Sequence, residues 1–286
     1  MNLALEVTRL KKEYDTFTLK DVSFSLPKGS IMGFIGENGA GKTTTIDLIL
    51  NLRTRDGGEV KIFQKDNIQE EKAIKRDIGI VLDESRFHDN LMPGDINKIM
   101  KHIYPTWQED SFSGYCKRFG LPMNQTVKKM SKGMGMKLSI AAALSHSPKL
   151  LILDEATSGL DPVVRNEILD IFLEYIQNEE NSILLSSHIT SDLERVADYI
   201  TFIHDGAIVF SEEKDVLMEE CGVLHTSRTD AALVQAADIL GRREHQFGVD
   251  LLIRGPQRLQ HKYRDMTIDP VSLEDIMVFY QRGNAS

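Results

Sequence analysis

The sequence of 286 residues contains little cysteine, with Cys116 and Cys221 as its two thiols. Two isolated cysteines exclude a disulfide-stabilised scaffold and a CxxC metal site, and they fit a reducing compartment. No apolar run approaches the roughly 20 residues that a membrane-spanning helix requires. Residues 1–14 mix acids with bases and lack the apolar core of a secretion signal. We therefore expect a cytosolic protein.

Positive charge is also scarce, because 43 Asp and Glu residues outnumber 34 Lys and Arg residues, for a net charge of −9. Sequence-independent binding to nucleic acid needs dense Lys and Arg, so we expect no nucleic-acid partner. A hydrophobic fraction of 41% and a charged fraction of 27% exclude a disordered chain. The length predicts one large domain, or a main domain with a small appendix.

Short apolar runs alternate with longer amphipathic segments along most of the chain. Four of these runs are apolar on both faces, which is typical of parallel strands covered by helices. They lie at 30–36, 78–83, 150–154 and 182–187. Residues 1–60 instead contain short strands separated by turn signals, which predicts a mainly antiparallel β subdomain. After Asp161, apolar residues recur at helical spacing, with Pro162 in the first turn.

Residues 90–147 carry three helical patterns and no strand pattern. The helical patterns lie near 95–104, 108–119 and 131–145. They predict a helical insert within an α/β core. The insert is rich in lysine and arginine although the whole chain is acidic. These basic residues form either a solvated helical face or a surface on which a partner docks.

The composition changes again near residue 220, and the remaining segment carries no functional motif. The expected elements are two strands and two helices, at 223–228, 231–240, 248–254 and from 272 onward. We expect them to form a small α+β appendix of βαβ-like order, in which Ser272 and Asp275 cap the last helix. The predicted domains are residues 1–219 and 220–286.

Residues 36–43 read GENGAGKT and match the phosphate-loop pattern G-x-x-x-x-G-K-[ST] between a predicted strand and a predicted helix. Backbone N–H groups on a concave path bind phosphate oxygens, and the helix N-terminus adds partial positive charge. Lys42 is expected to reach the outer phosphates, and the Thr43 hydroxyl to coordinate Mg²⁺. The loop therefore predicts binding of a nucleoside triphosphate rather than an ordinary glycine-rich turn. The expected binding residues are Glu37, Asn38, Gly39, Ala40, Gly41, Lys42, Thr43 and Thr44.

The buried strand LLILDE ends in two acids, Asp154 and Glu155. Charged residues commonly end strands, so the pair alone is weak evidence. Downstream of a phosphate loop, however, an acid at the tip of a parallel strand is placed to hold Mg²⁺. The adjacent acid is placed to activate the attacking water. We expect Asp154 to be a metal ligand and Glu155 to be catalytic.

With these motifs the sequence resembles the ATP-binding subunits of ABC transporters over about residues 3–215. In that family two subunits enclose two ATP molecules, and the signature motif of one, usually LSGGQ, faces the phosphate loop of the other. The resemblance assigns the signature to MSKGM at residues 130–134. It implies that Ser131 and Gly133 contact the nucleotide of the second subunit from a helix N-terminus.

The resemblance implies three further site residues. SGLD at 158–161 matches the loop that spans the dimer and includes Asp161. His188 matches the switch histidine that contacts the γ-phosphate and orients the water, although a lone histidine at a strand end is more often structural. Tyr14 matches the aromatic residue that stacks on adenine. Phe17 is a competing candidate for that stack, and an aromatic residue at this place could equally belong to the core.

Two departures from the family pattern concern the metal and the signature. Family members usually carry glutamine where this sequence has Asp83. A carboxylate is a stronger Mg²⁺ ligand than an amide, so we expect Asp83 to join the metal ligands, unless it faces water or the alignment is shifted. Lys132 replaces the first signature glycine and Met134 the glutamine. Lys132 either directs a charge toward the neighbouring phosphate or points to solvent.

The resemblance implies an α/β fold with a P-loop NTPase core: a mostly parallel sheet, an N-terminal antiparallel β subdomain, a helical insert and a small C-terminal appendix. It implies an ATPase that uses ATP and Mg²⁺ to power a bacterial ABC exporter. The opening LPKGSIMGFIGENGAGKTT and the closing VSLEDIMVFY are similar to ATPase subunits that export antimicrobial or amphipathic peptides or drugs.

The implied partners are a separate membrane-spanning permease and a second ABC ATPase subunit, identical or different. The protein would then lie on the cytoplasmic face of the cell membrane, held there by the permease. A soluble ABC-type ATPase that acts on ribosomes or DNA is the alternative. A P-loop kinase or GTPase would share the phosphate loop but would not explain the signature, SGLD or His188.

Overall fold

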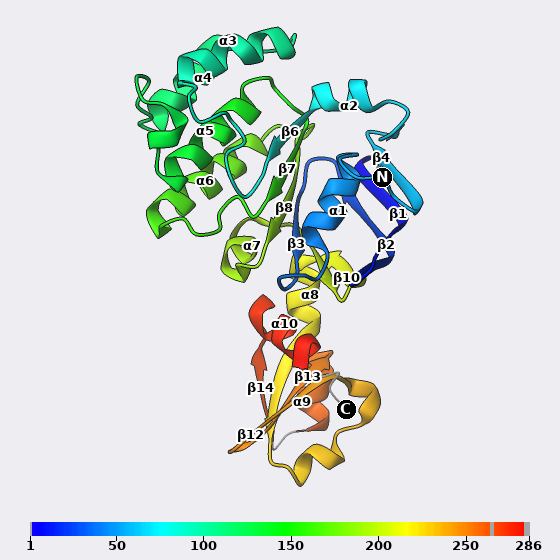
Figure 1. The fold of residues 1–286 in the computed structure, drawn as a ribbon. Coiled ribbons are helices and arrows are strands. Elements are labelled where there is room, and N and C mark those ends of the chain that lie inside the picture. Colours follow the sequence, from blue (N-terminus) through cyan, green and yellow to red (C-terminus); the bar gives the residue numbers. More distant parts are fainter. Residues whose placement is uncertain (1, 264–265, 283–286) are drawn as a thin grey trace. The chain divides into compact units, whose positions relative to one another are not determined.

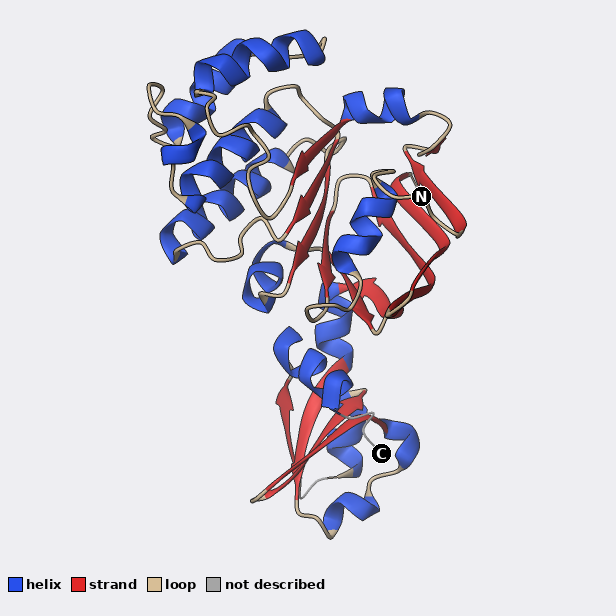
Figure 2. Ribbon diagram, in the orientation of Figure 1, coloured by secondary structure: helices blue, strands red, loops and turns tan. Residues whose placement is uncertain are grey.

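The computed structural model describes residues 2–263 and 266–282, which form two compact units, Met1–Ser211 and Glu212–Ser286. Figure 1 follows the chain through both units, and Figure 2 distinguishes their helices from their strands. Within the described residues, no helix is both long enough and apolar enough to cross a membrane. Each unit has its own sheets and its own buried apolar residues.

The first unit is built on a six-stranded sheet of order β10-β9-β3-β8-β7-β6. Its strands are β3 (Ile31–Ile35), β6 (Ile78–Val81), β7 (Leu150–Asp154), β8 (Ser182–Ser187), β9 (Tyr199–His204) and β10 (Ala207–Glu213). The pairs β9–β3, β3–β8, β8–β7 and β7–β6 are parallel. All residues of β3, β7 and β8 are buried, as the continuous apolar runs predict.

The parallel register brings the carboxyl ends of three strands to one edge of the sheet. Ile35 at the end of β3 pairs with Ser187 of β8, and Asp154 at the end of β7 pairs with Ser186 of the same strand. Loops that follow these strands therefore meet above this edge, which is where ligands bind in open parallel sheets.

Helices cover this sheet and form the expected insert (Figure 1). Helix α1 (Lys42–Ile49) follows β3, α2 (Glu71–Asp77) precedes β6, and α6 (Pro162–Tyr175) and α7 (Thr190–Val196) follow β7 and β8. The insert consists of α3 (Pro93–Ile103), α4 (Glu109–Arg118), the short 3₁₀ helix η1 (Val127–Lys129) and α5 (Lys132–Leu144). These helices pack on one another, and α5 also contacts β6.

The N-terminal antiparallel sheet has the order β2-β1-β4-β5. It contains β1 (Leu3–Tyr14), β2 (Phe17–Pro27), β4 (Gly57–Ile62) and β5 (Lys65–Asp66), and all three pairings are antiparallel. The expected α/β fold, with its mostly parallel sheet and its antiparallel subdomain, is confirmed.

The second unit differs from the expected βαβ-like order. Its sheet, β12-β13-β11-β14, pairs every neighbouring strand antiparallel. The strands are β11 (Cys221–Thr226), β12 (Ile239–His245), β13 (Gly248–Arg254) and β14 (Thr267–Pro270), with helices α8 (Lys214–Glu220), α9 (Pro256–Lys262) and α10 (Leu273–Arg282). The expected helix at 231–240 is wrong, because the chain forms two 3₁₀ turns, η2 (Asp230–Leu233) and η3 (Ala236–Asp238), and then enters β12.

The expected cap of the last helix is present. Ser272 Oγ accepts a hydrogen bond from the Asp275 N–H at 3.0 Å, and Asp275 Oδ2 accepts one from the Ser272 N–H at 3.1 Å. This reciprocal pair satisfies two amide groups that helix geometry leaves without a partner at the start of α10.

Candidate nucleotide-binding and hydrolysis site

The phosphate-loop sequence forms a tight loop between β3 and α1. Gly41, the residue before α1, has φ 112° and no side chain caps the helix. Gly39 has φ 86°, and a Cβ at Gly39 would meet nothing within 4 Å. Both values of φ favour glycine. The loop thus directs free backbone N–H groups and a helix N-terminus toward open space, which suits a phosphate chain.

Lys42 is the buried cation of this loop, with 6% of its surface exposed. Its Nζ donates hydrogen bonds to the Gly36 and Glu37 carbonyl oxygens, at 2.8 and 3.2 Å. The same Nζ lies 3.3 Å from Glu155 Oε1. One ammonium group therefore joins the start of the phosphate loop to the acid that follows β7.

Thr43 and Asp154 form a second contact between the loop and β7. The Thr43 hydroxyl donates a hydrogen bond to Asp154 Oδ2 at 2.9 Å. Asp154 is 4% exposed, and its other carboxylate oxygen is buried without a hydrogen-bond partner. Burial raises the pKa of Asp154, and the nearby charges of Glu155 and Asp83 raise it further. A buried carboxylate with one open oxygen, beside a hydroxyl, fits the oxygen-ligand chemistry of Mg²⁺.

Glu155 has a backbone conformation that is rare for its residue type, with φ 52°. Its N–H donates a hydrogen bond to the Ser186 carbonyl oxygen at 3.1 Å, which holds the turn after β7 against β8. Its Oε2 lies 2.6 Å from Nδ1 of His188, the residue after β8. The two predicted catalytic residues are therefore in direct contact, and Lys42 touches the other oxygen of the same carboxylate.

Lys42, Thr43 and Glu155 border a cavity of about 600 Å³, whose lining does not include Asp154 or His188. Its lining includes Tyr14 and Phe17 together with most of the phosphate loop, whereas Ala40 is buried. Lys12 Nζ and Arg53 Cζ lie 5.6 and 6.0 Å from the centre of the Tyr14 ring, contacts that sequence reasoning missed. Phe17 packs on the loop, because a Cβ at Gly41 would lie 2.9 Å from its ring. Both aromatic residues thus face the cavity.

The residues of the predicted signature motif lie away from the phosphate-loop cavity of the same chain. Ser131 caps α5 by accepting a hydrogen bond from the Met134 N–H at 3.2 Å, and Asp161 caps α6 by accepting two. Ser131, Gly133 and Asp161 line a separate cavity of about 380 Å³, which shares no lining residue with the phosphate-loop cavity. The structure therefore brings these three residues to one another, and not to the phosphate loop of the same chain.

Of the three residues that depart from the family pattern, Asp83 and Lys132 are exposed and Met134 is half-buried. The Asp83 side chain is 57% exposed and lies 3.4 Å from Arg86. Lys132 is directed toward the loop of Asp161, since its Nζ is 3.2 Å from the place of a Cβ on Gly159. Asp83 and Lys132 both line a further cavity of about 280 Å³.

The phosphate loop follows a strand of a parallel sheet, and the pairs Thr43–Asp154 and Glu155–His188 lie beside it. This arrangement defines a P-loop nucleotide hydrolase. The ABC transporter family pattern matches residues 19–158. The chain is 36% identical over 214 residues to the lantibiotic transport ATP-binding protein SrtF of Streptococcus pyogenes, covering 74% of this chain and 91% of that one. It is 34% identical to the bacitracin transport ATP-binding protein BcrA of Bacillus licheniformis, over 73% of this chain and 69% of the relative.

A solved ATP-binding subunit of an ABC transporter has the same fold, with a TM-score of 0.69 and 27% identity over 74% of this chain and 90% of that one. The chain belongs to the ABC transporter family as an ATP-binding subunit, and it is an ATPase.

Proposed function

We propose that this ATPase powers a bacterial exporter of antimicrobial or amphipathic peptides or drugs. The relatives that carry lantibiotic and bacitracin transport in their names support this substrate class. The observation that carries the catalytic part is the convergence of Lys42 and His188 on the carboxylate of Glu155. The proposed ATPase domain is residues 1–219, and the appendix, 220–286, contributes none of the proposed site residues.

Glu155 is the general base in this proposal. Its carboxylate accepts a proton from the attacking water, and His188, 2.6 Å away, orients that water and contacts the γ-phosphate. Lys42 clamps the outer phosphates, because its ammonium group lies at the start of the loop. Tyr14 stacks on adenine. Within one subunit, Lys42, Glu155 and His188 are already next to one another.

Thr43 and Asp154 are the proposed Mg²⁺ ligands, and Asp83 joins them. Mg²⁺ at this place supplies positive charge that neutralises the phosphate oxygens. The open oxygen of Asp154 is the main support for the site. The charge of Asp83 is one of the causes that raise the pKa of Asp154, although the Asp83 side chain is 57% exposed and lies beside Arg86.

A second ABC ATPase subunit, identical or different, completes each site. Ser131, Gly133 and Asp161 cannot serve the phosphate loop of their own chain, since they line a separate cavity. A partner subunit that turns its own phosphate loop toward this second cavity gives them a nucleotide to bind. The amide groups at the start of α5 then meet a phosphate, as helix N-termini favour.

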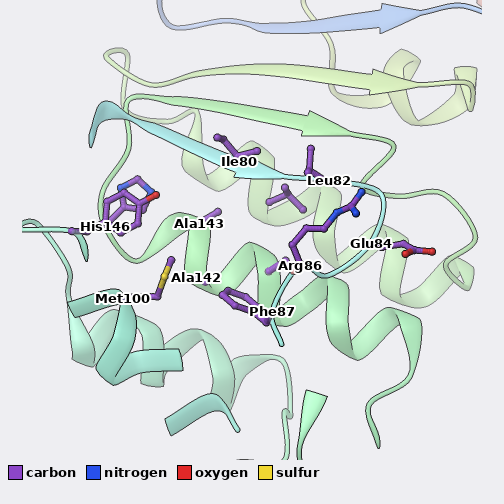
Figure 3. Close-up of a pocket in the computed structure, with 12 residues that line it drawn as sticks. Ile80, Leu82, Glu84, Arg86, Phe87, Met100, Ala142, Ala143 and His146 are labelled. Carbon is purple, nitrogen blue, oxygen red and sulfur yellow. The ribbon is translucent and has the colours of Figure 1, made fainter. Parts of the chain in front are cut away.

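The membrane-spanning permease docks on the helical insert. A cavity of about 250 Å³ lies between β6, the loop after it, α3 and α5. Figure 3 shows apolar side chains in its lining, including Ile80, Met100 and Ala142, with Glu84 and Arg86 on the loop after β6. Ile99 and Ile103 of α3 are exposed nearby, at 44% and 59%. An apolar hollow with a charged rim suits a short partner segment, and this attachment holds the protein at the cytoplasmic face of the membrane.

The two-subunit arrangement is tested by light scattering of the Glu155→Gln variant in excess MgATP. We expect a stable dimer, because binding persists while hydrolysis stops. The matched control adds Ser131→Arg, which blocks the signature cavity and should restore the monomer. A Glu155→Gln variant that binds MgATP and stays monomeric contradicts an arrangement of two identical subunits.

A further inference from the structure

Three side chains that the hydrolysis site does not use lie together where the phosphate loop meets the β9–β10 turn. They are Glu37, His204 and Asp205, and each offers a ligand atom within 4.8 Å of the others. The turn is attached to the loop, since the Gly206 N–H donates a hydrogen bond to the Ala40 carbonyl oxygen at 3.0 Å. Backbone contacts therefore fix the two segments that carry the three side chains.

The separation of Glu37 and His204 is compatible with two ligands of one metal ion. His204 Nδ1 lies 3.1 Å from Glu37 Oε1, yet Nδ1 is shielded from solvent and makes no hydrogen bond. Two atoms that bind one metal at about 2.1 Å, with an angle of about 90–110°, are separated by about 3.0–3.4 Å. The observed separation lies within that range.

Asp205 is the third member of the cluster. Its Oδ2 lies 3.8 Å from His204 Nε2, on the other side of the ring from Glu37. The side chain is 82% exposed, and one of its carboxylate oxygens lies within 4.8 Å of the ligand atoms of Glu37 and His204. The left-handed conformation of Asp205, with φ 44°, places it in a tight turn directly after the histidine.

The charges of the cluster also favour a cation. Among the described residues, neither Glu37 nor Asp205 forms an ion pair with a lysine or an arginine. The second unit contains a histidine–aspartate cluster around Asp250 that, in contrast, includes an arginine. There Asp250 accepts a hydrogen bond from Arg243 at 2.8 Å and lies 2.7 Å from His225 Nδ1. A metal would have to displace that arginine, whereas no such group opposes a cation at His204.

We propose that Glu37, His204 and Asp205 bind a divalent transition-metal ion such as Zn²⁺. An imidazole with two carboxylates suits Zn²⁺ and its neighbours, while Mg²⁺ prefers an all-oxygen site such as Thr43 with Asp154. The backbone of Glu37 stays available to the phosphates, and only its side chain binds this metal. An ion here links the phosphate loop to the β9–β10 turn through side chains as well as backbone.

Calorimetric titration of the full chain with Zn²⁺, without nucleotide, tests the site. We expect one equivalent to bind, and His204→Ala to lower the affinity by about 100-fold. His225→Ala is the matched control, and its Zn²⁺ affinity should equal that of the wild type. Both cysteines are buried, and burial raises the pKa of each thiol to about 11, so they do not compete for the metal.

A second measurement guards against misfolding of the His204→Ala variant. Asp205→Asn alters an exposed side chain and should weaken Zn²⁺ binding by about tenfold while the circular dichroism spectrum stays unchanged. Co²⁺ bound at the site should give visible absorption bands that Asp205→Asn shifts. No saturable Zn²⁺ binding, or binding that survives both His204→Ala and Asp205→Asn, overturns the proposal.

Discussion

Two buried aspartates, one in each unit, have pKa values that are shifted in opposite directions. Asp154 and Asp250 are 4% and 5% exposed. Asp154 keeps one oxygen without a partner, and burial raises its pKa. Burial alone would also raise the pKa of Asp250, but Arg243, His225 and His245 donate to that carboxylate and lower it. The first carboxylate is left open, and the second is neutralised by its neighbours.

This difference in hydrogen bonding distinguishes Asp154, which is available to a ligand, from Asp250, which stabilises the fold of its unit. An unpaired buried charge costs folding free energy unless something compensates it. In the first unit this cost falls beside the phosphate loop, where the proposed Mg²⁺ would compensate the negative charge of Asp154. In the second unit, the Asp250 cluster joins β11, β12 and β13 and needs no ligand.

The largest expected effect is on hydrolysis. Asp154→Asn should lower the MgATP hydrolysis rate by at least about 100-fold, because the amide is a weaker metal ligand and the metal supplies several kcal/mol. Asp250→Asn should leave the rate within about twofold, because Asp250 belongs to the second unit, which contains none of the proposed site residues. Steady-state phosphate release measures both. Equal losses in the two variants would break the comparison.

Stability should respond in the reverse order. Asp250→Asn removes charged hydrogen bonds, and we expect the free energy of unfolding of the second unit to fall by about 1–3 kcal/mol. Asp154→Asn should raise the melting temperature instead. The folded-state pKa of Asp154 lies above its unfolded value, so its ionised form at neutral pH destabilises the fold. Scanning calorimetry distinguishes the two signs, and a destabilised Asp154→Asn variant contradicts the interpretation.

The buried residue His146 extends the comparison to the pH dependence of stability. It is 1% exposed, its Nδ1 has no hydrogen-bond partner, and burial lowers its pKa to about 4. The unfolded chain takes up the proton first, so stability present above about pH 6.5 should fall by about 1.4 kcal/mol per pH unit down to about pH 4. Urea unfolding at pH 7, 6 and 5 should show a shallower fall for His146→Phe. The exposed His88→Gln variant should retain the wild-type slope.

The smallest expected effect is on KM for ATP, through the stacking of the adenine base. Tyr14 has a buried hydroxyl without a hydrogen-bond partner and two cations beside its ring. Tyr14→Ala should raise KM for ATP about tenfold, since a base stacked on an aromatic ring gains about 1–3 kcal/mol. Tyr14→Phe keeps the ring and should change KM less. A larger rise in KM for Phe17→Ala than for Tyr14→Ala would assign the stack to Phe17.

The sequence was sufficient for the elements whose pattern has one physical meaning. Strands buried on both faces, such as Ile31–Ile35, favour a continuous apolar run, and GENGAGKT combines a strand end, glycines and a helix start. The contact between Glu155 and His188 follows from this framework, because the ends of adjacent parallel strands meet at one edge.

The second unit shows where such inference fails. Strand β12, ILGRREH, carries arginine and glutamate, and its place in the sheet depends on β13 beside it. The alanines and leucines of 231–240 favour a helix locally, but tertiary pairing of β12 from Ile239 onward overrides that preference. The cluster of Glu37 and His204 could not be predicted from the sequence either, because these two residues are far apart in the chain and match no spacing motif.

The central claim is that Glu155 turns a nucleotide-binding loop into a hydrolytic site. Its most direct test is the MgATP hydrolysis rate of Glu155→Gln, measured with ATP affinity and beside the exposed control Glu179→Gln. We expect a fall of about 10²–10⁴-fold in rate with unchanged affinity, and no change in the control. A Glu155→Gln variant that hydrolyses MgATP at the wild-type rate would contradict the account.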